Sequence, residues 1–305
     1  MVKPAALSVN TTSLPKFIDI FVHPIKQAYY RLFPKDLTFT KSENGIRHFR
    51  SFINITASKE GVNKEGSYES ISGSGQFNRS TLPILIEKIK NIFYSRNLVI
   101  VDLREEPHGF VNGDPVHWKI DSRKAHESEE SFLSGLPKFF LKWRKLFVFI
   151  YVPIPVAASE TSTEEQAIKK LKNKNIEYLR LPITDHCKPS NTVTDQIVKL
   201  FFEYSAKSTW LHFHCAVGKG RTTTAMAMCD IMRNAGKLSL DEILHRQHLI
   251  GGEDLRLFRK KKFTENARER FEFLENFYRY CKLVDINTQT WTQWIERQPP
   301  SERQV

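Results

Sequence analysis

The segment that most constrains the fold is a strand, a short glycine-containing loop and a helix in direct succession. The apolar run 210–213 leads through Cys215 into a loop with Gly218 and Gly220, and the helix-forming run 225–234 follows. Glycines permit the backbone angles that a tight loop needs. A loop that opens into a helix N-terminus also aims several backbone N–H groups at one point, where they attract an anion. The sequence therefore predicts an anion-binding loop at the end of a buried strand.

Apolar runs and helical patterns alternate along much of the chain. Such runs are typical of buried strands, and helical periodicity or N-cap residues mark the segments between them. Alternating strands and helices indicate an α/β fold with an at least partly parallel sheet. The predicted strands cover residues 98–103, 146–152, 178–183 and 210–213, and the predicted helices cover residues 82–94, 190–206 and 264–283, with another that opens at 161–165.

The composition favours a folded protein with anionic partners. The 305 residues are 40% hydrophobic, and 46 Lys and Arg residues against 34 Asp and Glu residues give a net charge of +12. A chain of about 300 residues buries about 75% of its unfolded surface, which excludes intrinsic disorder for the body. No apolar run reaches the roughly 18 to 20 residues of a membrane span, and a secretory leader is not evident. We therefore expect a soluble protein, cytoplasmic or exported by a non-Sec route.

The predicted loop carries a nucleophile. The four cysteines form no CxxC pair, so reduced thiols are expected rather than disulfides or structural zinc. Backbone N–H groups and the helix N-terminus would lower the pKa of the Cys215 thiol and stabilise its thiolate. Arg221, six residues later, offers a bidentate fork for a phosphate. We expect Thr222 to hydrogen-bond the sulfur, His214 to order the loop, and the loop residues Ala216, Val217, Gly218, Lys219 and Gly220 to hold the phosphate oxygens.

These residues resemble the signature of a known superfamily. The pattern His214-Cys215-x5-Arg221-Thr222 is similar to the active-site motif of the protein-tyrosine phosphatases. Other segments resemble one branch, the tyrosine-phosphatase-like inositol phosphatases, also called cysteine phytases. These segments are residues 72–77 (SGSxQF), 102–113 (DLRxExHGxxNG), 184–189 (TDHxxP) and 277–280 (FYxY), and the resemblance covers roughly residues 46–283.

The resemblance implies a domain organisation. It implies a tyrosine-phosphatase-like α/β core, a central and mostly parallel sheet flanked by helices, across residues 46–283. A small β-rich subdomain is expected from about 46–80 and 105–145. Residues 1–45 would form an N-terminal arm and residues 284–305 a C-terminal tail. The branch needs no metal and no other cofactor.

Asp185 is the expected general acid. An inositol alkoxide is a poor leaving group, so cleavage needs a carboxyl group placed about 3 Å from the bridging oxygen. Asp185 follows a predicted strand on a loop that ends at Pro189, and His186 is expected to accompany it in substrate contact. The alternative is an Asx turn that caps the following helix.

Extra cations are expected around the loop, because an inositol polyphosphate carries several charges besides the phosphate that is attacked. Lys219 lies in the loop itself, and residues 256–270 contain seven basic side chains. The alternative for that segment is a solvated basic turn, and for Asp102 a plain aspartate at a strand end. By resemblance, Arg270 and Lys262 are expected at the rim of the pocket, and Arg50 is expected to reach the pocket from the N-terminal region. Asp102 is expected to contact substrate hydroxyls or to position basic partners.

The expected reaction is hydrolysis of a phosphate monoester through a phosphocysteine intermediate. Myo-inositol hexakisphosphate or another inositol polyphosphate is the favoured substrate. Lys219 also resembles the loop of phosphoinositide phosphatases, so a lipid headgroup, with peripheral contact to an anionic membrane, is the first alternative. A protein-tyrosine or dual-specificity phosphatase and a non-catalytic inositol-phosphate binder are further alternatives.

Other classes of protein fit the sequence less well. A Walker A nucleotide loop is excluded, because Gly220 stands where that pattern requires Ser or Thr. Nucleic acid is disfavoured as a partner because RRM, zinc-finger and helix-turn-helix signatures are missing. The oligomeric state and a role as a bacterial effector in a host cell stay open.

Overall fold

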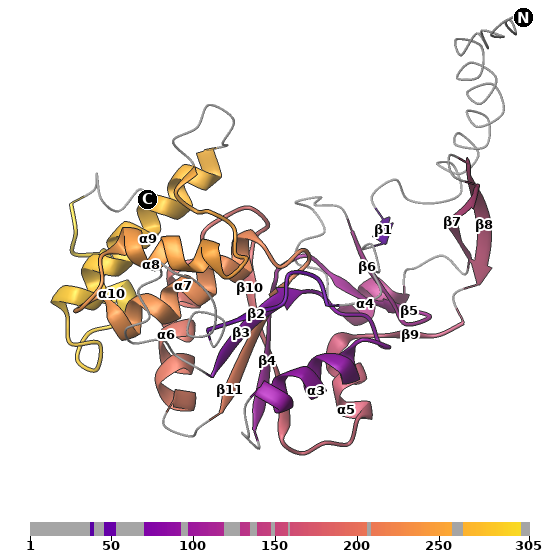
Figure 1. Cartoon of the computed structure of the whole chain (residues 1–305), viewed down its shortest axis with the longest axis horizontal. Helices are drawn as coiled ribbons and strands as arrows, with labels where there is room; N and C mark the ends of the chain where they lie inside the picture. Colours follow the sequence, from indigo (N-terminus) through magenta and orange to yellow (C-terminus); the bar gives the residue numbers. More distant parts are fainter. Residues whose placement is uncertain are drawn as a thin grey trace, which may run out of the picture. The chain divides into compact units, whose positions relative to one another are not determined.

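The computed structural model describes residues 37–39, 46–52, 70–92, 97–118, 129–134, 139–147, 150–157, 159–205, 209–257 and 265–299 (Figure 1). The predicted N-terminal arm lies outside these residues except for 37–39, and so does the predicted substrate contact Lys262. The chain divides into two units, residues 1–37 with 137–158, and residues 38–136 with 159–305. The second unit contains the central sheet and all the described residues of the predicted site.

A five-stranded sheet forms the centre of the larger unit. Four of its five strands run parallel to one another, which confirms the predicted α/β class, and only the short strand at the end of the sheet runs antiparallel. The second and third strands are buried along their whole length, which is typical of strands covered on both faces. The order is β10 (Ile176–Ile183), β4 (Leu98–Arg104), β11 (Trp210–Cys215), β3 (Ile71–Gly75) and β2 (Arg50–Ser51).

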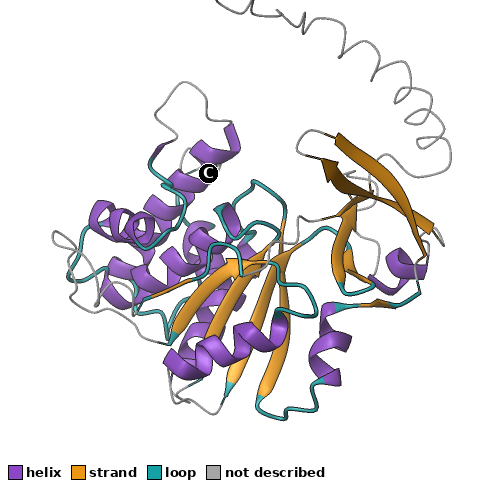
Figure 2. Ribbon diagram, turned by 45° about the vertical axis from the view of Figure 1, so that its right-hand side comes forward, coloured by secondary structure: helices purple, strands orange, loops and turns teal. Residues whose placement is uncertain are grey.

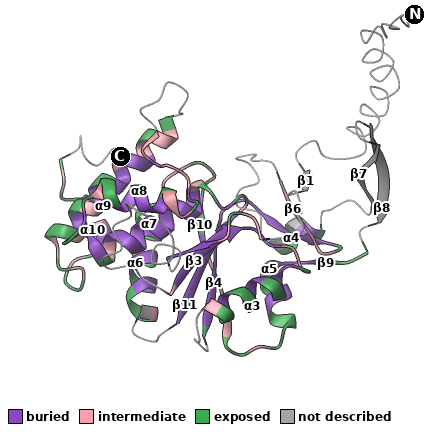
Figure 3. Ribbon diagram, in the orientation of Figure 1, coloured by how far each residue is buried: buried purple, intermediate pink, exposed green. Residues whose placement is uncertain are grey.

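Helices cover both faces of this sheet (Figure 2). Alternate residues of β4 enter two separate cores, because successive side chains of a strand point to opposite faces: Val99 and Val101 lie in one core, Ile100 in the other. On the first face lie α6 (Asn191–Ser205), α7 (Gly220–Asn234), α8 (Leu240–Leu249), α9 (Glu265–Leu283) and α10 (Trp291–Ile295). On the second face lie α3 (Leu82–Ile92) and α5 (Glu164–Lys170), whose outer sides are exposed (Figure 3).

The glycines of β3 allow α7 and the loop before it to pack closely against this strand. A Cβ atom on Gly73 would lie 2.6 Å from both Met226 Sδ and Thr222 Cγ2 in α7, and one on Gly75 would lie 2.7 Å from the Val217 carbonyl oxygen. Side chains at these positions would push β3 away from the loop and from α7. The glycine-rich segment is therefore a buried strand beside β11.

A second, smaller sheet has the order β1 (Leu37–Phe39), β6 (Asp114–Trp118), β5 (His108–Val111) and β9 (Thr161–Ser162). The short helix α4 (Glu129–Ser134) contacts β5. The predicted β-rich subdomain therefore needs correction. The strands described within 46–80, β2 and β3, belong to the central sheet, because β3 pairs in parallel with β11 and β2 pairs with β3.

The smaller unit contains a β-hairpin. Strand β7 (Phe139–Phe147) pairs in antiparallel fashion with β8 (Ile150–Ala157). The prediction of one strand over residues 146–152 is wrong, because the chain reverses direction between Phe147 and Ile150. The apolar run spans the end of one strand and the start of the next.

The predicted C-terminal tail is packed rather than separate over residues 284–299. Helix α10 begins at a capping box formed by Thr290 and Gln293, and Trp291 is buried against Phe273, Phe277 and Tyr280. Aromatic packing of this kind buries a large apolar area. Within the described residues, none of the helices is both long and apolar enough to span a membrane.

Candidate active site

The anion-binding loop lies between β11 and α7 and runs from Cys215 to Arg221; we call it the phosphate loop. Central strand β11 ends at Cys215, and α7 begins at Gly220. Gly218 has a φ of +83°, and a Cβ atom there would collide with the backbone of Ser74 and Gly75. The loop can therefore follow this path only with glycine at position 218.

The surroundings of the Cys215 thiol favour its ionised form. The sulfur accepts hydrogen bonds from the Gly218 N–H at 3.3 Å and from the Thr222 hydroxyl at 3.2 Å. Burial acts to raise the pKa of this thiol, but the charge of Arg221 and these two donors outweigh burial and hold the pKa below its ordinary value. A thiolate at the base of the loop is the nucleophile that phosphoryl transfer needs.

Glu106 holds the guanidinium of Arg221. Arg221 Nη1 and Nη2 donate to the two carboxylate oxygens of Glu106 at 2.6 and 2.9 Å, and Nη1 also donates to the Ile183 carbonyl at 3.0 Å. Burial acts against both charges, but Arg104 and Arg221 together keep the pKa of Glu106 well below its ordinary range, and Glu106 raises the pKa of Arg221. Glu106 was not among the predicted site residues, although it lies within the segment 102–113.

Asp185 lies beside the same arginine. Its Oδ1 atom is 3.0 Å from Arg221 Nη2 and accepts the His186 N–H at 3.1 Å. His186 has a φ of +65°, and its carbonyl accepts a hydrogen bond from Arg270 Nη2. Arg270 thus connects α9 to the loop that carries Asp185.

These residues line one cavity of about 220 Å³. The cations around it come from the phosphate loop and from α9, and Asp185 and Glu253 add negative charge. Glu253, whose carboxylate lies 3.7 Å from Arg270 Nη1, was not among the predicted site residues and belongs to none of the recognised motifs. The lining residues are Asp185, His186, Cys215, Val217, Lys219, Gly220, Arg221, Glu253 and Arg270.

Arg50 supports the phosphate loop from behind rather than from the cavity. Its buried guanidinium donates to the Gly218 carbonyl at 2.7 Å and to the Thr223 hydroxyl at 2.9 Å, and burial lowers its pKa to about 10. Arg47 donates to the Ala216 carbonyl at 2.8 Å in the same way. In this structure Arg50 therefore contacts the back of the phosphate loop and does not line the cavity, where it was expected.

Asp102 is also absent from the cavity lining. Its fully buried carboxylate accepts the Arg104 N–H at 3.0 Å and the Tyr178 hydroxyl at 3.1 Å, and lies 3.2 Å from His108 Nε2. Burial acts to raise the pKa of Asp102, but His108 outweighs it and keeps the pKa below its ordinary value. Asp102 thus lies against a buried basic partner and does not line the cavity.

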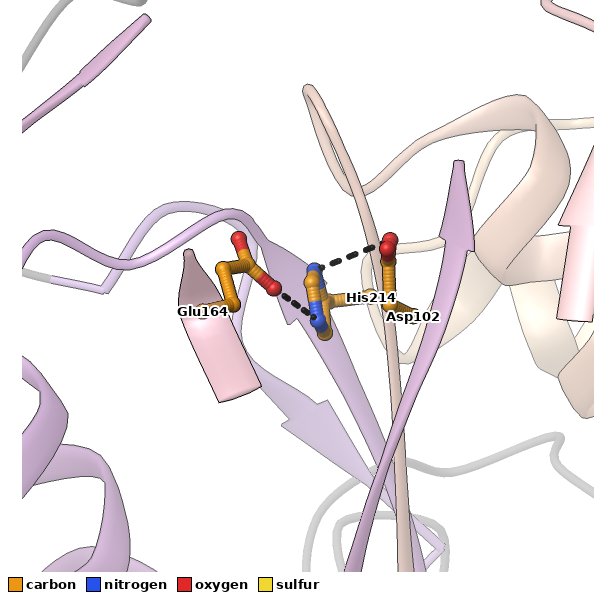
Figure 4. Close-up of side chains that lie close together, drawn as sticks. All are labelled: Asp102, Glu164 and His214. Atoms are coloured by element: carbon orange, nitrogen blue, oxygen red, sulfur yellow. Dashed lines mark ion pairs between the residues drawn. The ribbon is translucent and has the colours of Figure 1, made fainter. Parts of the chain in front are cut away.

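His214 lies between two buried carboxylates (Figure 4). Glu164 Oε2 is 3.1 Å from His214 Nε2, and Asp102 Oδ1 is 4.0 Å from His214 Nδ1. Burial acts to lower the pKa of His214, but the two carboxylates, Glu164 above all, raise it above its ordinary value. Because each carboxylate faces a different ring nitrogen, the arrangement suits an imidazolium, which has no lone pair for a metal ion.

The chain is similar in sequence to a known protein family and to a known bacterial protein. Residues 148–233 match the family model PTPlike_phytase, described as inositol hexakisphosphate. The effector protein hopD2 of Pseudomonas syringae pv. tomato is 28% identical over 236 residues, which are 68% of this chain and 49% of that protein. The chain thus spans about half the length of this relative.

Two solved structures share the fold. One is the PTP-like myo-inositol phosphatase of Mitsuokella multacida in complex with myo-inositol-(1,3,4,5)-tetrakisphosphate. It is 27% identical in sequence with a TM-score of 0.68, and the match covers 86% of this chain and 47% of that chain. The other is a PTP-like phytase of Bdellovibrio bacteriovorus, which is 25% identical with a TM-score of 0.64. That match covers 87% of this chain and 98% of the other chain. The chain belongs to the family of protein-tyrosine-phosphatase-like phytases.

Proposed function

We propose that the chain is a cysteine-dependent phosphomonoesterase that hydrolyses inositol polyphosphates. The observation that carries this proposal is the cavity in which Cys215, Arg221 and Asp185 meet, with Lys219 and Arg270 as additional cations. The inositol tetrakisphosphate complex of the Mitsuokella relative supports the same substrate class.

In the first step, the Cys215 thiolate attacks phosphorus and the bond to the inositol oxygen breaks. The N–H groups of the phosphate loop and the guanidinium of Arg221 bind the equatorial oxygens, where charge is concentrated in the transition state. Asp185, in its protonated form, gives its proton to the departing inositol oxygen. A phosphocysteine and the shortened inositol phosphate result.

In the second step, water displaces the sulfur from phosphorus. Asp185, now a carboxylate, accepts a proton from that water. The leaving thiolate is stabilised by the Thr222 hydroxyl and the Gly218 N–H, which already donate to the sulfur. Orthophosphate then leaves, and the free enzyme is restored.

Charge directs the choice of substrate. Lys219, Arg221 and Arg270 around one cavity of about 220 Å³ favour a ligand with several phosphates over a single phosphotyrosine. Myo-inositol hexakisphosphate is therefore the first substrate to test. A phosphoinositide headgroup carries the same chemical groups and is the second.

The test is phosphate release by the purified chain, at moderate salt and without added metal. Hexakisphosphate, a soluble phosphoinositide and a phosphotyrosine peptide are offered in parallel to wild type, Cys215→Ser and the control Cys281→Ser. Release from hexakisphosphate that only Cys215→Ser abolishes supports the proposal. Preference for another substrate reassigns the enzyme, and tight binding without release on all three makes the chain a binding module.

We also propose that the protein acts as an effector in a host cell. The similarity to hopD2, which is named as an effector protein, supports this proposal. A translocation reporter fused to the full-length protein tests it: signal inside host cells supports delivery, and signal confined to the bacteria contradicts it.

A further inference from the structure

His214 and Arg221, which stand before and after the backbone N–H groups of the phosphate loop in the sequence, belong to one buried network. His214 comes immediately before Cys215, and Arg221 ends the phosphate loop. In β11, successive side chains point to opposite faces, so Cys215 enters the core beside α7 while His214 faces α5. The partner of His214 is therefore found on the far side of the sheet from the cavity.

That partner is Glu164, the first residue of α5. The helix is held at its start by the Thr163 capping box, which fixes the position of the following residue. Glu164 is fully buried. One carboxylate oxygen lies 3.1 Å from His214 Nε2, and the other accepts a hydrogen bond from Gln76 Nε2 at 2.6 Å.

From Gln76 the network continues to the catalytic arginine. Gln76 Oε1 accepts a hydrogen bond from Arg104 Nη1, and Arg104 Nε donates to Glu106 Oε1 at 2.8 Å. Glu106 in turn binds both terminal nitrogens of Arg221. We call this series the polar chain; its members, all buried, are His214, Glu164, Gln76, Arg104, Glu106 and Arg221.

Charges around Glu164 come from three strands. His214 of β11 and His108 of β5 face its carboxylate, at 3.1 and 3.6 Å, and Asp102 of β4 contacts the same two histidines. His108 Nδ1 lies 2.9 Å from the Glu106 carbonyl, which can only accept, so this nitrogen carries a proton. Two carboxylates thus share two imidazoles in a site without water access.

We propose that Glu164 is a positioning residue: it fixes His214 at the start of the phosphate loop and, through the polar chain, Arg221 at its end. The role rests on the proposed function, since it concerns the same loop. In a buried network, loss of one charged member leaves its neighbours without their counter-charge. Removal of the Glu164 charge would discharge His214 and loosen Arg221, and both changes disfavour the Cys215 thiolate.

The test measures the thiolate itself and needs no turnover. Cys215 is alkylated with iodoacetamide across a range of pH, and its peptide is quantified by mass spectrometry because the other cysteines also react. The variants are Glu164→Gln and the control Glu165→Gln, an exposed neighbour on α5 that pairs with Lys169. Thermal melting shows whether each variant is folded.

For Glu164→Gln we expect the alkylation midpoint to rise by about one pH unit. One unit of thiol pKa is a factor of ten in thiolate, so the rate below the midpoint falls about tenfold. The Glu165→Gln midpoint stays at the wild-type value. A folded Glu164→Gln variant that titrates like wild type would overturn the proposal.

A second variant covers the case in which Glu164→Gln does not fold. Gln76→Met breaks the polar chain in the middle but leaves the ion pairs at both ends. We expect inorganic phosphate to protect its Cys215 from alkylation only at concentrations several-fold above those for wild type, because Arg221 is less well held. Unchanged protection would overturn the proposal. Failure of wild type to hydrolyse any inositol phosphate would instead refute the proposed function, since alkylation does not depend on it.

Discussion

Arg221 and Glu106 join the end of the phosphate loop to the segment after β4 by two hydrogen bonds of 2.6 and 2.9 Å. The same arginine also lies 3.0 Å from Asp185. One guanidinium therefore connects the loop that binds phosphate with the loop that carries the proposed acid. A bidentate pair sets both the distance and the plane of the guanidinium, which makes Glu106 as important for geometry as for charge.

The variant Glu106→Gln is expected to lower kcat/KM about 100-fold, because Arg221 loses its counter-ion and its fixed orientation. Breaking a buried ion pair should also cost about 3 kcal/mol of unfolding free energy. Steady-state kinetics and urea unfolding measure the two effects. The neighbouring Glu105→Gln, a partly exposed position, serves as control, and equal losses in both variants would contradict the assignment.

The variant Thr222→Val is expected to move the rising limb of the pH–rate profile to higher pH. The hydroxyl donates to the sulfur at 3.2 Å and helps to keep the pKa of Cys215 below its ordinary value, although burial opposes it. A lowered thiol pKa means that thiolate is present at lower pH, so loss of the donor shifts its appearance upward. Buried Thr194, whose hydroxyl bonds the Ser190 carbonyl, gives the control Thr194→Val. An unmoved limb in Thr222→Val would show that the hydroxyl does not stabilise the sulfur.

Gly218→Ala is expected to destabilise the protein by about 1–3 kcal/mol and to abolish most activity. At a φ of +83° an L side chain is strained, and the added Cβ would collide with β3. Gly236→Ala is the matched control, because nothing lies within 4 Å of its Cβ position; its stability should stay within about 1 kcal/mol of wild type. Thermal melting and phosphate release compare the two. Similar behaviour of both variants would argue against a special backbone at Gly218.

Glu253→Gln is expected to lower the KM for hexakisphosphate about threefold to tenfold at low salt, since it removes a negative charge from the cavity and leaves Arg270 unpaired for substrate. The gain should shrink as ionic strength rises, because salt screens charges at a partly exposed site. Initial rates at two salt concentrations measure this, with Glu272→Gln on the outside of α9 as control. A KM that rises would mean that Glu253 binds substrate hydroxyls instead.

The larger part of the fold was predictable because its signals are local. The apolar runs of β4, β10 and β11 are continuous, and the helices between them show their periodicity or their caps, so the α/β class and the mostly parallel sheet followed. The hairpin of β7 and β8 was missed, because one apolar run crosses the turn. The glycines of β3 by themselves favoured a turn, and the structure shows that they stand in a buried strand that packs closely on α7 and the phosphate loop.

The sequence by itself determined the loop and the family and predicted the nucleophile, since Cys215, Gly218, Arg221 and Thr222 stand within a few residues of one another. Only the tertiary structure decided which distant residues serve them. Strand pairing and helix packing bring Glu106 and Arg50 to the phosphate loop across 115 and 168 positions of the sequence. They bring Glu164 to His214 across 50 positions. A buried charge is fixed by the partner that folding brings to it, and no local pattern records that partner.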